Sequence, residues 1–185
     1  MRKGRELNEV LMDIEKEMPD FNADEFLKYT EWAIQKLYNS LRDNEKSEVK
    51  CEEELISKLD EQRLKYRITK DIDHISIHYA EILDVIRKDG IMYIQVYLSV
   101  YFYDNTKNNI NMDDDLDYKY WNDIWIVTLG EDIELERKKS NCVNCGAIMK
   151  YNKARSTFEC EYCGNIVHND FDSGWKIVDI ELGEW

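Results

Sequence analysis

Proline and glycine are scarce in this 185-residue sequence, which contains one proline and seven glycines. These residues are the strongest local breakers of regular structure, so we expect most of the chain to lie in helices and strands. Long apolar runs are also absent, because the longest stretch, residues 91–103, is interrupted by Gln95 and Ser99. A bilayer-spanning helix needs about 18 consecutive apolar residues, and none is expected here. Hydrophobic residues still make up 43% of the chain, which excludes disorder and allows a packed core.

Basic residues are outnumbered, with 25 Lys and Arg against 39 Asp and Glu and a formal net charge of −14. The imbalance is uneven, because residues 137–155 contain six cations and no acid. The rest of the chain therefore holds 19 cations against 39 acids, a net charge of −20. A body of that charge repels nucleic acid and anionic lipid, so we expect neither as a partner.

The first 20 residues do not have the composition of a targeting signal. They are too charged for a secretory signal, and they lack the Arg-rich, acid-poor composition of a mitochondrial transit peptide. We therefore expect a cytoplasmic protein. In a reducing cytoplasm, closely paired cysteines serve as metal ligands rather than as disulfides.

Helical periodicity dominates the first third of the chain. Over residues 7–18, apolar side chains recur at helical spacing, at Leu7, Val10, Leu11, Ile14 and Met18. A second helix is expected from Asn22 to about residue 41, because Asn22 and Glu25 form a capping box that Phe21 and Phe26 flank as a hydrophobic staple. A third is expected over about 49–64, with one apolar stripe formed by Cys51, Leu55 and Leu59. We interpret Cys51 as a core thiol.

The pattern changes to strands after about residue 66. Residues 72–87 are rich in Ile and Val, and Asp89-Gly90 is a hairpin turn signal. The next strand has an apolar face made of Met92, Ile94, Val96, Leu98, Val100 and Phe102, and a second face made of Tyr93, Gln95, Tyr97, Ser99, Tyr101 and Tyr103. Further strands are expected at 121–129 and 175–182, after an acidic loop at 104–119. Helices followed by an antiparallel sheet predict an α+β fold in which the helices pack on the apolar face.

Four of the five cysteines form two Cys-x2-Cys motifs, made of Cys142, Cys145, Cys160 and Cys163. A glycine follows each motif and tolerates the positive φ of the tight turn. Two intervening residues let both thiolates of a motif reach one metal ion, and four thiolates close a tetrahedral shell. The spacing therefore predicts one structural Zn2+ ion. Two disulfides, four free thiols and an iron–sulfur centre remain as alternatives. His168 is expected on the surface, because four cysteines already complete the ligand set.

Several further motifs occur in a fixed order around these cysteines. They are Pro19-Asp20-Phe21 with Phe26 and Trp32, then Tyr101-Phe102-Tyr103-Asp104, then Trp121 and Trp125, then the two cysteine motifs, and finally Gly174-Trp175. In this order the chain resembles the Tim-forty-four-like domain family over roughly residues 18–182, and most closely its free-standing bacterial members with an inserted zinc ribbon. The resemblance implies a cone-like fold similar to nuclear transport factor two, with helices in the concave face of a curved antiparallel sheet and a pocket between them.

The resemblance also implies a division of the chain. Residues 1–20 would form an N-terminal amphipathic helix. Residues 21–136 and 171–185 together would form the cone domain, and residues 137–170 would form a zinc ribbon inserted before the last strand. The mitochondrial import anchor of this family has a long N-terminal region and binds cardiolipin. Here only about 20 residues precede the domain and their helix is acidic, so we do not expect that role.

Three functions are compatible with these observations. We favour a non-enzymatic interaction or scaffold module, whose contact surface would be the tyrosine-bearing strand face and whose partner would be another protein or a second copy of the chain. The second is a small-molecule binder or enzyme that uses the cone pocket, with polar candidates at His74, His78, Tyr79 and Asp104. No nucleophile–base pair is identifiable among them, so no catalytic residue is assigned. The third is nucleic-acid binding through the basic ribbon, with Tyr151, Phe158 and Tyr162 as its aromatic residues.

Overall fold

The computed structural model describes residues 5–43, 45, 47, 49–66, 72–104, 120–132, 140–152, 157–168 and 174–183. The helices come first, and they are α1 (Leu7–Glu15), α2 (Ala23–Asp43) and α3 (Leu55–Tyr66). The strands follow, and they are β1 (Ile72–Lys88), β2 (Ile91–Asp104), β3 (Tyr120–Glu131), β4 (Ser140–Asn141), β5 (Ile148–Asn152), β6 (Thr157–Glu159), β7 (Ile166–His168) and β8 (Trp175–Gly183). Helices followed by antiparallel sheets confirm the predicted α+β class.

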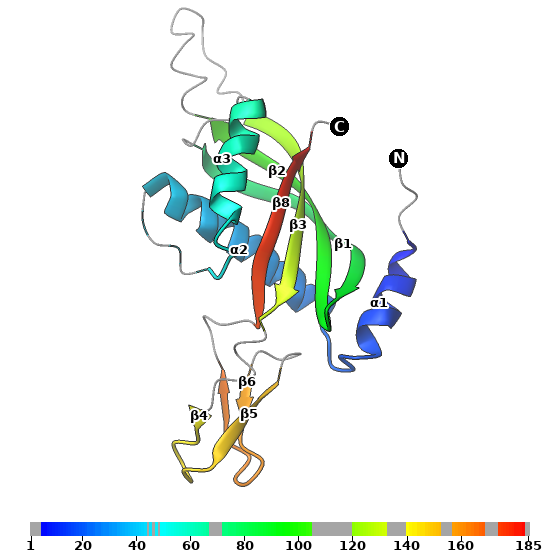
Figure 1. Ribbon diagram of the computed structural model, residues 1–185, viewed down its shortest axis with the longest axis vertical. Coiled ribbons are helices and arrows are strands. Elements are labelled where there is room, and N and C mark those ends of the chain that lie inside the picture. The colour runs from blue at the N-terminus through cyan, green and yellow to red at the C-terminus, as the bar shows by residue number, and fades with distance from the viewer. Residues whose placement is uncertain are drawn as a thin grey trace, which may run out of the picture.

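The larger sheet has the strand order β1-β2-β3-β8, and every neighbouring pair is antiparallel. β1 and β2 form a hairpin that turns at Asp89 and Gly90, as predicted. Their φ angles of 54° and 79° are the left-handed values that a tight hairpin turn of this kind requires. Figure 1 shows the three helices lying against this sheet. The acidic loop was predicted over residues 104–119; Asp104 is the last residue of β2, and residues 105–119 lie outside the described residues.

The alternating pattern of β2 places the core where it was predicted. All six side chains of its apolar face are buried, whereas Tyr93, Tyr97 and Tyr101 on the other face are partly exposed. The buried face shares one hydrophobic cluster with residues from all three helices. At its centre, Trp125 of β3 stacks on Tyr38 of α2 with the ring centroids 4.8 Å apart. Burial of these apolar surfaces is the main force that holds the helices on the sheet.

The first two helices form as their sequence signals predict. α1 ends at Glu15, slightly before the predicted boundary, and buries Val10 and Ile14. At the start of α2, the backbone N–H of Glu25 donates to Asn22 Oδ1 at 3.2 Å. The Phe21 and Phe26 rings pack with their centroids 5.4 Å apart, as expected for the staple.

The predicted third helix was wrong at its beginning, because α3 begins at Leu55 rather than near residue 49. Residues 50–52 instead run parallel to β8, where Ile177 N–H donates to Lys50 O and Glu52 N–H donates to Ile177 O, both at 2.9 Å. The physical reason is that an edge strand presents unpaired backbone groups, and this segment satisfies some of those on β8. Cys51 is thus half-buried at the sheet edge rather than on a helical stripe, although it does pack against the core as predicted.

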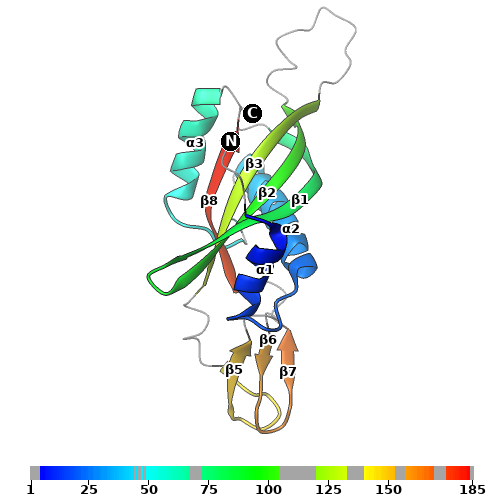
Figure 2. The same cartoon turned by 90° about the vertical axis from the view of Figure 1, so that its right-hand side faces the viewer.

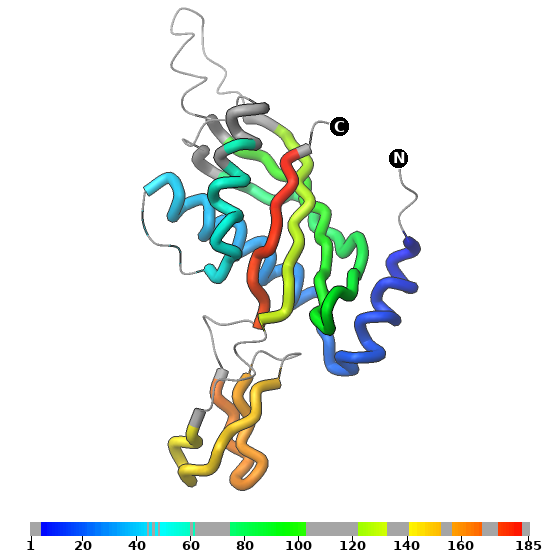
Figure 3. Tube along the Cα trace, in the orientation of Figure 1, coloured from blue at the N-terminus to red at the C-terminus, as the bar shows by residue number. Residues whose placement is uncertain are grey.

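The smaller sheet has the order β4-β5-β6-β7 and is built entirely from chain between β3 and β8. It has its own small cluster of buried residues, formed by Cys142, Met149, Phe158 and Cys160. Figures 2 and 3 show this sheet at one end of the molecule, beyond the larger sheet. In the part of the chain that the structure describes, no helix combines the length and apolarity needed to cross a bilayer.

Candidate metal centre

Two loops of the smaller sheet, which we call the knuckles, have the same backbone arrangement. In the first, residues 142–147, Cys142 N–H donates to Ala147 O at 2.7 Å and Gly146 N–H donates to Cys142 O at 2.8 Å. In the second, residues 160–165, the equivalent bonds link Cys160 to Asn165 and Gly164 to Cys160, both at 2.9 Å. The glycines have φ of 74° and 69°, a conformation that strains other residues. Each short Cys-x2-Cys-Gly motif therefore closes the same turn.

The knuckles bring the four predicted cysteines together. The four Sγ atoms all lie within 4.8 Å of one another. Across the knuckles, Cys142 Sγ lies 3.5 Å from Cys163 Sγ, and Cys145 Sγ lies 3.5 Å from Cys160 Sγ. All four are free thiols, of which Cys142 and Cys160 are buried while Cys145 and Cys163 face solvent. Four sulfur atoms at such separations are a donor set that could hold one soft metal ion.

Backbone N–H groups set which thiols ionise most readily. Burial disfavours the thiolate of Cys142, but N–H groups from Asn144 and Cys145 outweigh burial and lower its pKa to about 6. In the second knuckle, the N–H group of Cys163 lowers the pKa of Cys160. The Asn165 N–H group favours the Cys163 thiolate, but the hydrogen bond to Cys142 and the other nearby thiols prevail and raise the pKa of Cys163 to about 12. The first cysteine of each knuckle is therefore the stronger acid, and a metal ion would displace the protons that its partners retain.

Among the described residues, the aromatic side chain of Tyr151 makes a contact between the knuckle sheet and the larger sheet. The Tyr151 ring of β5 packs on Phe158 of β6, with centroids 5.1 Å apart, within the small cluster. The same ring lies directly over Gly174, at the entrance to β8, where an added Cβ would collide with it. Gly174 O accepts the backbone N–H of Asp132 at 2.8 Å, and the Asp132 carboxylate pairs with Lys50 at 2.6 Å. This contact between the two sheets was not predicted from the sequence.

The two other predicted site residues whose side chains the structure describes, His78 and Tyr79, do not converge on a common site. His78 lies on β1 with its ring 4.3 Å from that of Tyr101, and Tyr79 donates to Glu81 at 2.9 Å. His168 ends β7. The side chains of His74, Asp104 and His168 lie outside the described residues. Of the six basic residues of the ribbon, Lys150 is described and pairs with Glu161 at 2.6 Å, and the other five lie outside the described residues.

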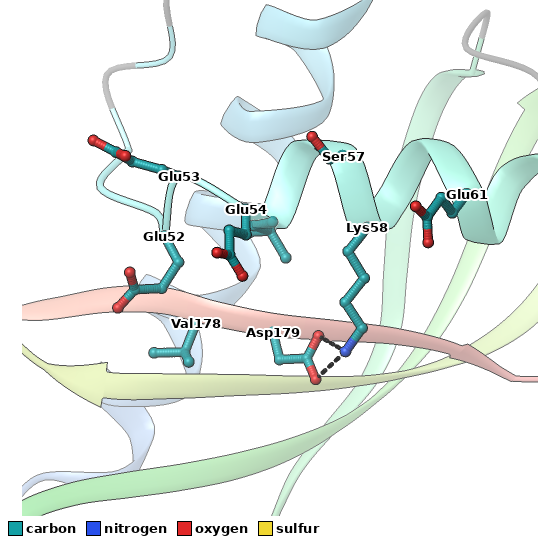
Figure 4. Close-up of a pocket in the computed structure, with 9 residues that line it drawn as sticks. Glu52, Glu53, Glu54, Ser57, Lys58, Glu61, Val178 and Asp179 are labelled. Carbon is teal, nitrogen blue, oxygen red and sulfur yellow. Dashed lines mark hydrogen bonds and ion pairs between the residues drawn. The ribbon is translucent and has the colours of Figure 1, made fainter.

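A groove of about 830 Å3 lies between the beginning of α3 and β8 and was also not predicted. Its lining is strongly acidic, made of Glu52, Glu53, Glu54, Glu61 and Asp179, with Leu55, Ser57, Lys58 and Val178. Figure 4 shows the Glu54 and Glu61 side chains pointing towards β8, where Lys58 reaches Asp179. That pair is 2.5 Å apart, and Glu52 pairs with Lys176 at the same distance.

Comparisons of this chain with protein-family models, with curated proteins and with solved structures found no match.

Proposed function

We propose that this protein is a non-enzymatic interaction module stabilised by one zinc ion, which Cys142, Cys145, Cys160 and Cys163 hold. The observation that carries the proposal is the convergence of four thiols from two equivalent knuckles to within 4.8 Å. Thiolates are favoured ligands of Zn2+, and four of them fill its tetrahedral shell. A filled shell leaves no position for substrate, so the ion would stabilise the fold rather than catalyse a reaction.

The chemistry of the donor set supports a structural zinc site over a catalytic one. Catalytic zinc sites keep an open position and commonly include histidine or carboxylate ligands. Among the described residues, no histidine or carboxylate joins the sulfur cluster. An iron–sulfur centre also uses four thiolates, so metal analysis must separate it from zinc. A cytoplasmic setting would keep the thiols reduced and available as ligands.

We further propose that residues 137–170 are a zinc ribbon inserted into a cone-like domain made of residues 21–136 and 171–185, with residues 1–20 as an N-terminal amphipathic helix. The strands of the smaller sheet all fall within 140–168, and β8 then completes the larger sheet, which supports this division. The order of helices, sheet and cysteine motifs also supports kinship with the Tim-forty-four-like domain family.

The interaction role rests on the tyrosine-bearing face of the larger sheet, opposite the helices. Tyr79 on this face is 52% exposed, and its ring lies 6.0 Å from that of Tyr97 on the neighbouring strand. Ile86 is exposed on the same face. Tyrosine is enriched at protein interfaces because it combines a large apolar area with a hydrogen-bonding group. The net charge of −14 makes a protein a better partner for this surface than nucleic acid.

Elemental analysis of the purified protein tests the metal site. We expect one zinc ion per chain in the wild type and a loss of zinc in Cys145→Ser. Cys51→Ser is the matched control, because Cys51 lies at the edge of β8 and outside the sulfur cluster. Iron in place of zinc, or no metal in the wild type, would refute the assignment.

Affinity purification from the native cells, followed by mass spectrometry, tests the interaction role. We expect a protein partner to be recovered with the wild type and lost with Tyr97→Asp, while that variant keeps its zinc and its thermal stability. A partner that is retained equally by both proteins would show that the tyrosine-bearing face is not the contact surface.

A further inference from the structure

The four thiols of the sulfur cluster lie in contact as two pairs. Cys142 Sγ lies 3.5 Å from Cys163 Sγ, and Cys145 Sγ lies 3.5 Å from Cys160 Sγ. Both contacts cross from one knuckle to the other. A disulfide joins sulfur atoms about 2 Å apart, so either pair could close with a movement of about 1.5 Å. The arrangement that could hold a metal ion therefore also brings together two pairs of thiols that could be oxidised.

Each of these pairs joins an exposed cysteine to a buried one. Cys163 and Cys145 are exposed, whereas their partners, Cys142 and Cys160, are buried. A small oxidant in solution therefore meets one thiol of each pair first, while the second thiol lies beside it at contact distance. This is the arrangement of a redox-sensitive cysteine, which is accessible to solvent and has a resolving thiol next to it. The reacting form is the thiolate, and a cysteine that ligates zinc is already in that form.

The fifth cysteine of the chain lacks these properties. Cys51 is half-buried at the edge of β8, where it pairs with Ile177, and it lies outside the sulfur cluster. Burial and the nearby Glu52 carboxylate raise the pKa of its thiol, so less of it is present as the reactive thiolate. Cys51 is therefore an internal reference for a thiol that should resist oxidation.

We propose that hydrogen peroxide converts the four thiolates of the cluster into two disulfides that cross the knuckles, Cys142–Cys163 and Cys145–Cys160. The inference rests on the proposed function, because zinc held by these cysteines would be released as they are oxidised. In each pair the exposed thiolate attacks one peroxide oxygen. The O–O bond breaks, a sulfenic acid forms, and the departing hydroxide takes up a proton to become water.

The buried thiolate of each pair then attacks the sulfenic sulfur. The S–S bond forms, the S–O bond breaks, and the second hydroxide also leaves as water after taking up a proton. In total, four thiolates, two peroxide molecules and four protons give two disulfides and four water molecules. A dithiol reductant reverses the reaction by thiol–disulfide exchange. In the cytoplasmic setting proposed above, disulfides of this kind are usually transient and redox-sensing.

The two disulfides would replace zinc as the link between the knuckles. Their cysteines are 21 and 15 positions apart in the sequence, and cross-links over such loops restrict the unfolded chain. The oxidised protein should therefore keep the small cluster with Met149 and Phe158, and with it the contact of Tyr151 with Gly174. Peroxide would then change the metal content of the protein while the fold is retained.

Treatment of the zinc-loaded wild type with a small excess of hydrogen peroxide tests the proposal. A chromogenic chelator measures zinc release, thiol titration counts the reduced cysteines, and mass spectrometry of an unreduced digest maps the disulfides. We expect release of the zinc, loss of four of the five thiols with Cys51 left reduced, and both cross-knuckle disulfides. Dithiothreitol with added zinc should restore the starting state. The oxidised protein should melt about 5 °C or more above the reduced, metal-free protein.

The Cys145→Ser variant separates the two ways in which the remaining thiols could pair. Pairing across the knuckles gives Cys142–Cys163, which we expect, whereas pairing within a knuckle gives Cys160–Cys163. Cys51→Ser is the control and should release zinc as the wild type does. Within-knuckle disulfides, sulfinic acids in place of disulfides, or a zinc-loaded protein that keeps its thiols and its zinc in peroxide would overturn the proposal. A wild type isolated without zinc would instead refute the proposed function, and the disulfide map of the reduced, metal-free chain would then decide the pairing.

Discussion

Replacing Gly174 by alanine tests whether Tyr151 fixes the smaller sheet to the larger one. Gly174 has a φ of 74° and is buried, and the hydroxyl and ring edge of Tyr151 occupy the space that a Cβ would need. Alanine at this position would therefore combine backbone strain with a steric collision. The left-handed conformation costs a non-glycine residue about 1–2 kcal/mol. Overpacking of a filled site costs a further 1–3 kcal/mol or so. We expect a total destabilisation of about 2–5 kcal/mol.

Gly90 provides the matched control, because its φ of 79° is similar and no atom lies within 4 Å of its ideal Cβ. Gly90→Ala should therefore show the backbone strain alone, about 1–2 kcal/mol. The measurement is urea-induced unfolding of both variants, with midpoints compared at constant m-value. In thermal melts, each kcal/mol should lower Tm by about 2–4 °C for a chain of this size.

A double-mutant cycle identifies Tyr151 as the cause of the difference. In the Tyr151→Ala background, Gly174→Ala should destabilise only as much as Gly90→Ala does, because the colliding ring is gone. The coupling energy between the two positions should then be about 1–3 kcal/mol. Equal effects of Gly174→Ala and Gly90→Ala in the wild-type background would refute the contact and the placement of the smaller sheet that depends on it.

Three further predictions follow from other parts of the molecule. Val96→Asp should prevent folding, because Val96 is fully buried and the charge would have no partner; a soluble protein with a normal melt would contradict the core assignment. Hydrogen bonds from Lys16 and Arg5 lower the pKa of Asp13 to about 2. The stabilisation that these bonds give α1 is therefore present above the ordinary pKa of an aspartate, near 3.8, and is lost as the pH falls through about 2. NMR titration should show that the pKa of Asp13 is higher in Lys16→Ala than in the wild type. Vesicles containing cardiolipin should not co-sediment with the protein at physiological salt, since the exposed face of α1 is acidic; binding that depends on residues 1–18 would refute this.

Features encoded by neighbouring residues could be predicted from the sequence. The alternation along β2 identified its buried face because strand side chains point to opposite sides in turn. Asn22 and Glu25 located the start of α2 because a cap involves residues only three positions apart. The sulfur cluster was predictable for the same reason, since each knuckle supplies two ligands from one turn. The four ligands also require that the two knuckles lie side by side, and the short antiparallel hairpin of β5 and β6 places them there.

Features that depend on distant residues could not be predicted in this way. Lys50 and Glu52 pair with Ile177 along the edge of β8, and nothing in the pattern around Cys51 distinguishes that arrangement from another turn of α3. Glycine at 174 signals an unusual backbone, but not that Tyr151 covers it. The acidic groove arises because α3 begins late, after the edge pairing, and so depends on the same tertiary contact.

These distant contacts form one continuous path between the knuckles and the acidic groove. The knuckle cluster includes Phe158, which packs on Tyr151, and Tyr151 covers Gly174. Gly174 bonds to Asp132, whose buried carboxylate holds Lys50 at 2.6 Å. Lys50 belongs to the segment that pairs with β8 and leads directly into the groove. Removal of a metal ion from the knuckles would therefore affect residues far from its ligands. Loss of the small cluster would free the Tyr151 side chain, and the backbone pairing along β8 that shapes the groove would weaken as a result.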